Sequence, residues 1–410
     1  MRQIWALASW LSGARIAAVG GVAAIAVVAA LASPSRVAAQ DRVATQDRAP
    51  FATVDLDAPL ALAKLVPELT SKRVIFIGEM HDRYDHHLNQ LEIIKRLRDA
   101  DPSMAIGVEY FQQPFQQYVD DYIAGRIGED EFLRRTEYFQ RWGWDYRLYA
   151  AIFRYARDQH IPVRALNVPS ALVSAVAKSG IAGLSEKDRA YLPKQIEPAD
   201  EAYRRRLRGA FQEHSFAGRD AFDHFVEAQL VWDEGMAESA AAYLDANPGR
   251  RMVILCGVGH VEYGAGIPMR LERRTHLSYA IVLNSGEEIE PRIADYLVLS
   301  EKKDLPPAGI LGVMLADKAG EVRIASLAPG GAAEKAGLRK GDVVVAIDAQ
   351  PIKTVADSRA ALWNKTPGER VHVKVRRKGR LGGASEVELD VELAAAPIDG
   401  GNQGGSRPPA

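Results

Sequence analysis

Over residues 58–299 the chain alternates between short apolar runs and longer amphipathic stretches. Unbroken apolar runs suit strands in the interior of a parallel sheet. Such runs lie at residues 74–77, 105–109, 163–166, 252–256, 279–283 and 295–299. Helical patterns lie at residues 60–69, 85–98, 112–125, 129–136, 146–159, 199–213, 219–246 and 267–274. Strands separated by helices predict an α/β fold, a mainly parallel sheet flanked by helices, over residues 51–300.

The pattern changes after residues 301–307, a linker rich in Lys, Asp and Pro. Four short apolar runs then follow at regular spacing, with one helix expected at 358–363. These runs lie at residues 309–315, 322–327, 343–347 and 371–376. We predict a small β-rich domain over residues 308–394, a size that folds independently. Residues 395–410 are mostly Gly, Pro, Asn and Ser, so we expect a disordered tail.

The first 39 residues have the pattern of a cleavable signal peptide. Arg2 and Arg15 precede an apolar stretch at 16–32, and small residues follow up to Ala39. The alternative is an uncleaved membrane anchor, for which the apolar stretch is at the short limit. We therefore expect export to the periplasm or cell envelope. The cleavage region holds no cysteine, so we do not expect a lipoprotein.

Composition narrows the function classes. The formal net charge of −1 does not favour a nucleic-acid partner. The single cysteine, Cys256, excludes an intramolecular disulfide and a cysteine-based zinc cluster.

Polar side chains follow the expected strands of the first domain. The first and fourth strands run into Gly-x-x-His, which brings Glu79 with His81 and, separately, His260; Glu109 and Asn167 follow two others. Any one of these side chains would ordinarily cap a helix or bond a loop. Together they predict one crevice, because ligands of open α/β sheets bind outside the carboxyl ends of the strands.

Two helical stretches add candidate residues to this crevice. His87 and Gln90 are three residues apart and share a face. Gln229, Asp233 and Met236 form one stripe on the long helix, which is either a polar cleft wall or a solvated face.

These residues carry a close resemblance to the ChaN-like haem-binding family of the haem-binding-uptake and Tiki superfamily. The matching segments are Gly78-Glu79-Met80-His81-Asp82, Gly107-Val108-Glu109, residues 141–146, residues 166–169, residues 229–237 and residues 257–268. Gly235 interrupts the long helix, which indicates a kink or a close approach.

The resemblance implies an exported protein of haem (iron-porphyrin) binding or iron uptake, with non-covalent haem. The cofactor-binding residues it implies are His81, His87, Gln90, Glu109, Asn167, Gln229, Asp233, Met236, His260 and Tyr263. Haem iron takes a His or Tyr ligand. The candidates are His81, His86, His87, His260, Tyr84, Tyr110 and Tyr263, with Arg83 and Arg141 as cations. The axial ligand stays open, and a haem shared across a homodimer interface is a further expectation.

Two other functions remain open. The superfamily includes metal-dependent hydrolases of protease or esterase type, so Glu79, His81, Glu109 and His260 are candidate catalytic residues. His81, His260 and Glu79 are also candidate ligands of a divalent metal. A non-enzymatic envelope scaffold is the third reading.

The second domain resembles a bacterial PDZ domain. The matching segments are residues 309–313, residues 327–338, residues 341–347 and residues 371–379. The resemblance implies that Ile310, Leu311, Gly312 and Val313 bind a peptide or protein C-terminus through an anion nest and an open sheet edge. The alternative is a domain that only packs against its neighbour.

Overall fold

The structure is a computed structural model, and it describes residues 62–212, 221–284, 290–379 and 383–396. The expected signal peptide and most of the expected tail lie outside these residues. None of the described helices is long and apolar enough to cross a membrane.

The first domain is built on a parallel sheet of six strands, in the order β3-β2-β4-β1-β5-β6. The strands are β1 (Val74–Glu79), β2 (Ala105–Gln112), β3 (Val163–Asn167), β4 (Met252–Gly257), β5 (Tyr279–Asn284) and β6 (Tyr296–Val298). The two strands that run into Gly-x-x-His, β1 and β4, are neighbours, and Glu79 pairs with Gly257 in their register. The expected α/β fold is confirmed, because all six apolar runs form strands.

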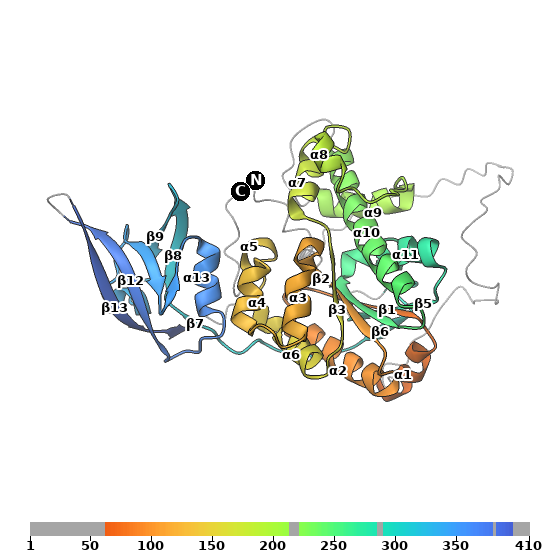
Figure 1. Ribbon diagram of the computed structural model, residues 1–410, viewed down its shortest axis with the longest axis horizontal. Coiled ribbons are helices and arrows are strands. Elements are labelled where there is room, and N and C mark those ends of the chain that lie inside the picture. Colours follow the sequence, from red (N-terminus) through yellow and green to blue (C-terminus); the bar gives the residue numbers. More distant parts are fainter. Residues whose placement is uncertain (1–61, 213–220, 285–289, 380–382, 397–410) are drawn as a thin grey trace, which may run out of the picture.

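Helices cover both faces of this sheet (Figure 1). One face packs against α1 (Leu62–Thr70), α2 (Tyr84–Ala100), α3 (Gln116–Ile123), α4 (Glu129–Arg135), α5 (Tyr138–Arg141) and α6 (Ala150–Asp158). The other packs against α7 (Ser170–Ser179), α10 (Ala221–Ala246) and α11 (Ile267–Thr275). The helices α8 (Glu186–Arg189) and α9 (Glu201–Gln212) lie between α7 and α10 in the chain.

The second domain has a five-strand antiparallel path, β13-β12-β10-β9-β8, with β11 paired to β10. Its strands are β7 (Gly309–Ile310), β8 (Val313–Lys318), β9 (Glu321–Leu327), β10 (Val343–Ile347), β11 (Gln350–Pro351), β12 (Arg370–Lys378), β13 (Ala384–Glu392) and β14 (Ala394–Ala395). Two helices, α12 (Ala332–Lys335) and α13 (Val355–Leu362), complete it. In this path β8 is an edge strand, and it lies beside α13 (Figure 1).

The structure corrects three expected element bounds. Gln112 ends β2 instead of beginning a helix, because a short 3-10 helix, Gln113–Phe115, precedes α3. The run at 309–315 is two strands, β7 and β8, since Gly312 turns the chain with a φ of +72°. The helix expected at 358–363 is α13, which begins three residues earlier at a Thr354 capping box.

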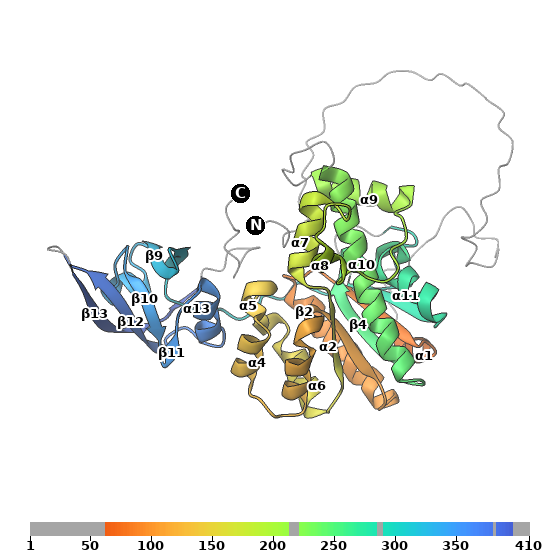
Figure 2. The ribbon, with the colours of Figure 1, turned by 45° about the horizontal axis from the view of Figure 1, so that its top comes forward.

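The two domains touch through α13 (Figure 2). Trp363, which directly follows α13, is buried, and its Nε1 donates to Asp130 Oδ1 at 2.8 Å. Its ring meets the ring of Tyr146 edge-on, with centroids 5.1 Å apart. The C-terminal domain therefore packs against the first domain. The outer edge of β8 is not paired with another described strand.

Candidate functional site

The polar residues at the strand ends form two networks, one on each face of the sheet. Side chains alternate along a strand. Glu79 therefore follows Ile75 and Ile77 onto the face that α2 covers. Glu109 lies between Val108 and Tyr110 and points to the opposite face, which α10 covers. Glu79 and Glu109 thus leave the same edge of the sheet on opposite faces. The two groups of residues remain close, because interactions with His260 and, more weakly, with His81 lower the pKa of Glu109 despite its burial.

Glu79 is the centre of the first network. His81 Nδ1 lies 2.7 Å from Glu79 Oε1, and His87 Nδ1 lies 2.7 Å from Oε2. Tyr110 donates its hydroxyl to Oε2 at 2.9 Å. His87 Nδ1 also lies 3.2 Å from Gln90 Oε1, so the predicted shared face of these two residues is confirmed.

His81 and His87 differ in whether a ring nitrogen lacks a hydrogen-bond partner. His87 Nε2 faces the carbonyl oxygen of His81 at 3.2 Å, so both nitrogens of His87 face acceptors. His81 uses Nδ1 on Glu79, and its Nε2 is buried with no hydrogen-bond partner among the described residues. A carboxylate-oriented imidazole with a free Nε2 is the arrangement of a general base or a metal ligand.

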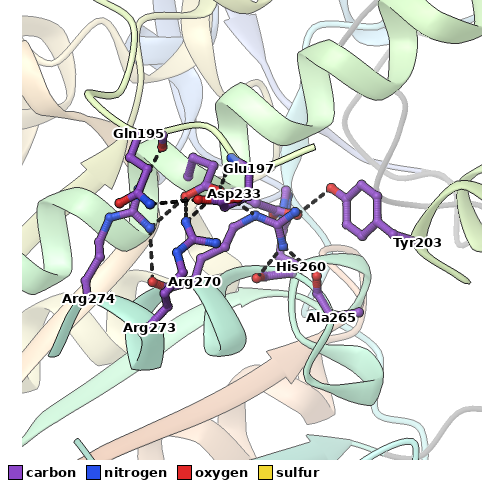
Figure 3. Close-up of polar contacts among 11 residues, drawn as sticks. Gln195, Glu197, Tyr203, Asp233, His260, Ala265, Arg270, Arg273 and Arg274 are labelled. Atoms are coloured by element: carbon purple, nitrogen blue, oxygen red, sulfur yellow. Dashed lines mark hydrogen bonds and ion pairs between the residues drawn. The ribbon is translucent and has the colours of Figure 1, made fainter. Parts of the chain in front are cut away.

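His260 is the centre of the second network. Its Nδ1 lies 2.6 Å from Asp233 Oδ1, and its Nε2 lies 3.4 Å from Glu109 Oε1. Tyr203 donates its hydroxyl to Asp233 Oδ2 at 2.6 Å (Figure 3). Glu109 also accepts from the amide of Gly257 at 2.8 Å. Both ring nitrogens of His260 are committed to carboxylates, which leaves neither for a metal or an iron.

Charge pairing sets the protonation of both networks. Burial alone would lower the pKa of His260, but the Glu109 and Asp233 carboxylates raise it to about 10. Burial also opposes the charge of His87, and Glu79 nevertheless raises its pKa. The pKa of Glu79 is lowered despite burial, because His87 and His81 stabilise the carboxylate. Each network is therefore held by buried imidazolium–carboxylate pairs.

An arginine cluster holds α11 against α10 beside the second network (Figure 3). Glu234 is fully buried and lies 2.9 Å from Arg273 Nη2 and 2.6 Å from Arg274 Nη1. Arg270 Nε lies 3.4 Å from the same carboxylate. Since Glu234 neighbours Asp233, this cluster fixes the turn of α10 that carries Asp233.

Tyr263 lies outside both networks, at the surface. Its side chain is 43% exposed, whereas His81, His87 and His260 are 0%, 1% and 5% exposed. Its backbone is left-handed, with a φ of +56°. Its hydroxyl donates to the carboxylate of Glu290. Burial and this hydrogen bond raise the pKa of Tyr263 to about 12.

The glycines after Tyr263 allow this arrangement. A Cβ on Gly266 would lie 2.0 Å from the carbonyl oxygen of His260, so no side chain fits there. Gly264 has a φ of +69°. The loop therefore folds back on His260, contacts α11 and leaves Tyr263 exposed.

The remaining candidates, Asn167, Gln229 and Met236, are all buried in the first domain. Asn167 Nδ2 donates to the carbonyl oxygen of Glu109 at 3.0 Å, and Trp232 Nε1 donates to Asn167 Oδ1. Gln229, 8% exposed, has a buried Oε1 with no hydrogen-bond partner among the described residues. Met236 is fully buried in the apolar core. The stripe Gln229–Asp233–Met236 is thus buried, which excludes the solvated-face reading.

Further candidates from the sequence have partners of their own, although Nε2 of His86 is buried with no hydrogen-bond partner among the described residues. Burial lowers the pKa of His86 to about 4, and its Nδ1 accepts from the amide of Met80. Arg83 is paired with Asp85, and Arg141 with Glu137.

Two members of the networks were not foreseen. Tyr149 donates to the carbonyl oxygen of His81 at 3.3 Å, and Tyr203 bonds Asp233. Both lie in stretches predicted as helices. The sequence pattern does not indicate which residue would bond a tyrosine hydroxyl there.

Within the described residues, no three His, Cys, Asp or Glu side chains are grouped so that they could hold a metal ion.

The loop at the start of the second domain has the form of an anion nest. Within the described chain no hydrogen bond uses the amide of Leu311 or Gly312. The carbonyl oxygens of these residues accept from Ala333 and Ala328, which orients the loop. Successive free amides in a glycine turn suit an anion.

Comparisons with known proteins match two parts of the chain to two different family models. Residues 65–271 match the family model described as haem-binding uptake, Tiki superfamily, ChaN, and residues 309–393 match a PDZ domain model. Protein RETICULATA-RELATED 5, chloroplastic, of Arabidopsis thaliana is 26% identical over 278 residues, 59% of this chain and 36% of that protein. A probable periplasmic serine endoprotease, DegP-like, of Brucella suis biovar 1 is 33% identical over 90 residues, 22% of this chain and 16% of that protein.

The chain thus spans about a third of the length of the first curated relative and about a sixth of the second. Among solved structures, one that reports cofacial heme binding to ChaN of Campylobacter jejuni is 18% identical. It has a TM-score of 0.48 and covers 58% of this chain and 91% of that one. The family match extends over half of the sequence and includes every residue of the two networks. The chain belongs to the ChaN family of the haem-binding-uptake, Tiki superfamily, and a PDZ domain follows its family domain.

Proposed function

We propose that the first domain binds haem at the surface around Tyr263, in the periplasm or cell envelope, and serves iron uptake. The single observation that supports this most is the exposure of Tyr263 on a left-handed backbone. A strained residue of this kind persists where surrounding structure holds it, which favours a functional role. A tyrosine phenolate is an established type of haem ligand.

The residues around Tyr263 are suitable for binding haem. Haem would supply a ferric centre that needs an axial oxygen or nitrogen. Tyr263 offers an accessible oxygen, and the exposed Met269 on α11 offers apolar surface for a porphyrin face. The buried histidines would need the surrounding segments to open first. Arg206 lies near Tyr263, but its Nη1 lies 3.3 Å from Glu262 Oε1, so a propionate would compete with Glu262 for this cation.

Hemin titration tests this assignment. Tyr263→Phe is expected to weaken binding at least about tenfold and to abolish the phenolate charge-transfer band. Tyr191→Phe is a matched control, since Tyr191 is 57% exposed and outside both networks. Unchanged hemin affinity and spectrum in Tyr263→Phe would overturn the assignment. Secretion is tested by sequencing the N-terminus of the periplasmic fraction, expected to begin after Ala39.

We propose that the PDZ domain binds a peptide C-terminus at Ile310–Val313. The free amides of Leu311 and Gly312 would receive the carboxylate, and the outer side of β8 would pair with the peptide. A fluorescent decapeptide with an apolar last residue should bind, and its amidated form should not. Equal binding of both forms would exclude the carboxylate nest.

A second candidate function is acid–base hydrolysis at His81. One observation favours it: Glu79 orients the ring and Nε2 has no partner among the described residues. In such a site Nε2 would take a proton from water while Glu79 stabilises the imidazolium. Activity with ester substrates that is lost in Glu79→Gln but kept in Tyr263→Phe would support this function over haem binding.

A further inference from the structure

One segment, residues 138–149, lies between the buried His81 and the PDZ domain. This bridging segment comprises α5, the residues Trp142–Asp145, a 3-10 helix at Tyr146–Leu148, and Tyr149. Figures 1 and 2 both show α5 next to α13 of the PDZ domain.

On its inner side the bridging segment closes over His81. The ring centroids of Trp142 and Trp144 lie 4.8 and 5.5 Å from that of His81. Tyr149 donates to the carbonyl oxygen of His81 at 3.3 Å, and its ring centroid lies 4.4 Å from that of His87. His81 is 0% exposed. The bridging segment therefore forms part of the cover over His81.

On its outer side the same segment holds the second domain. Tyr146 packs edge-on against Trp363, and Asp130 of α4 accepts from the Trp363 indole. Arg147, paired with Asp145, donates to the carbonyl oxygen of Pro306 in the linker at 2.7 Å. The linker and the PDZ domain thus share their attachment with the cover of His81.

Trp363 also lies at the end of the helix that flanks the edge strand of the PDZ domain. It directly follows α13, and α13 lies beside the edge strand β8. The amide of Val355 at the start of α13 donates to Asp317 Oδ1 of β8 at 3.1 Å. A strand added to β8 would therefore lie against α13, the helix that Trp363 directly follows.

We propose that occupancy of the PDZ domain controls access to His81 through the bridging segment. A peptide that spreads β8 and α13 withdraws Trp363 from Tyr146, and the segment that carries Trp142 and Trp144 loosens over His81. By thermodynamic reciprocity, a molecule that opens the segment at His81 changes peptide affinity by the same factor. The effect of a peptide rests on the proposed peptide binding. The link between Trp363 and the segment over His81 does not.

Histidine labelling of the full chain by diethyl pyrocarbonate, resolved by mass spectrometry, measures access to His81. Trp363→Ala is expected to raise the labelling rate of His81 at least about fivefold, the lower end of typical coupling. Trp363→Phe keeps an aromatic ring and loses the bond to Asp130, so an intermediate rate is expected. Arg370→Ala, at a side chain 74% exposed on β12, should leave the rate unchanged. The exposed His160 is the internal reference.

Unchanged His81 labelling in both Trp363 variants would overturn the link. The second arm adds a decapeptide ending in Ala-Val-Val with a free carboxylate, and its amidated form as control. Bound peptide is expected to raise His81 labelling in the wild type and to have no further effect in Trp363→Ala. Peptide that binds by anisotropy without changing His81 labelling would also overturn the proposal. Peptide that does not bind contradicts the proposed peptide function, and the variant arm then decides the link.

Discussion

Asp233 Oδ1 lies 2.6 Å from Nδ1 of His260, inside a network that is almost completely buried. Removal of Asp233 leaves the buried imidazolium of His260 with only its longer 3.4 Å contact to Glu109, which costs up to about 3–5 kcal/mol. Asp233→Asn should therefore destabilise the first domain by roughly this amount in urea unfolding. Asp223→Asn, on the same helix but 60% exposed in its pair with Arg204, should cost less than about 1 kcal/mol. Equal costs for the two variants would contradict a buried ion pair.

The same network predicts how stability depends on pH. The pKa of His260 is raised to about 10 in the folded protein, so its contribution is complete below about pH 6.5 and is lost up to pH 10. The pKa values of Glu79, Glu109 and Asp233 are lowered, so their contribution is lost as pH falls below about 4. The pKa of His86 is lowered to about 4 by burial, so stability is also lost as pH falls from about 6.5 towards 4. Melting temperature should therefore be highest near pH 6.5. Asp233→Asn should flatten the alkaline decline, and a wild type equally stable at pH 6 and 9 would contradict the assignment.

Haem binding through Tyr263 should strengthen as pH rises. The phenol must lose its proton to ligate iron, and its pKa is raised to about 12 by burial and Glu290. Below that value, apparent affinity should rise by up to about tenfold per pH unit. Glu290→Gln removes the neighbouring carboxylate, so it should strengthen hemin binding at neutral pH. A pH-independent affinity, measured by hemin titration, would argue for a different ligand.

The close approach at Gly235 predicts a stability pattern that can be tested by a double-mutant cycle. A Cβ at Gly235 would lie 2.1 Å from Val168 Cγ1, so the predicted close approach is confirmed. Gly235→Ala should cost about 1–3 kcal/mol through overpacking, and Val168→Ala should recover part of that loss. Gly209→Ala, in α9 with no atom within 4 Å of a Cβ, should instead stabilise by up to about 1 kcal/mol. Additive effects of the Gly235 and Val168 changes would rule out the contact.

A charge at Gly312 should distinguish the anion nest from a passive turn. Gly312 has a φ of +72°, and a Cβ there would meet its nearest atom at 3.6 Å, so a side chain fits. Asp and Asn both tolerate left-handed backbone, and only Asp adds negative charge. Gly312→Asp should weaken binding of a free-carboxylate peptide at least about tenfold more than Gly312→Asn. Equal affinities of the two variants, measured by anisotropy, would place the carboxylate elsewhere.

The sequence predicted the sheet well, because all six strands of the first domain are unbroken apolar runs. Strand β13 was not predicted from the sequence, although Val387, Leu389 and Val391 alternate with acidic residues. The acidic residues cover its exposed face, where they pair with basic residues of β12. A half-exposed strand of this kind has too few apolar residues to form a run.

The sequence named the candidate residues, but it did not show on which face of the sheet each side chain lies. Glu79 and Glu109 both end apolar runs, and the sequence does not show that their side chains leave the sheet on opposite faces. That separation depends on the exact phase of each strand, and β2 continues through an irregular register to Gln112. The partners Tyr149 and Tyr203 are distant in sequence from His81 and Asp233, and only the packing of helices brings them together.

The packing of Trp363 against Tyr146 has a consequence for weak ligands. A partner captured by the PDZ domain is held next to the first domain and no longer has to diffuse to it. Short tethers of this kind give effective local concentrations in the millimolar range. A partner with only modest affinity for each domain can then engage both at once, which makes two weak recognition steps sufficient for a stable encounter.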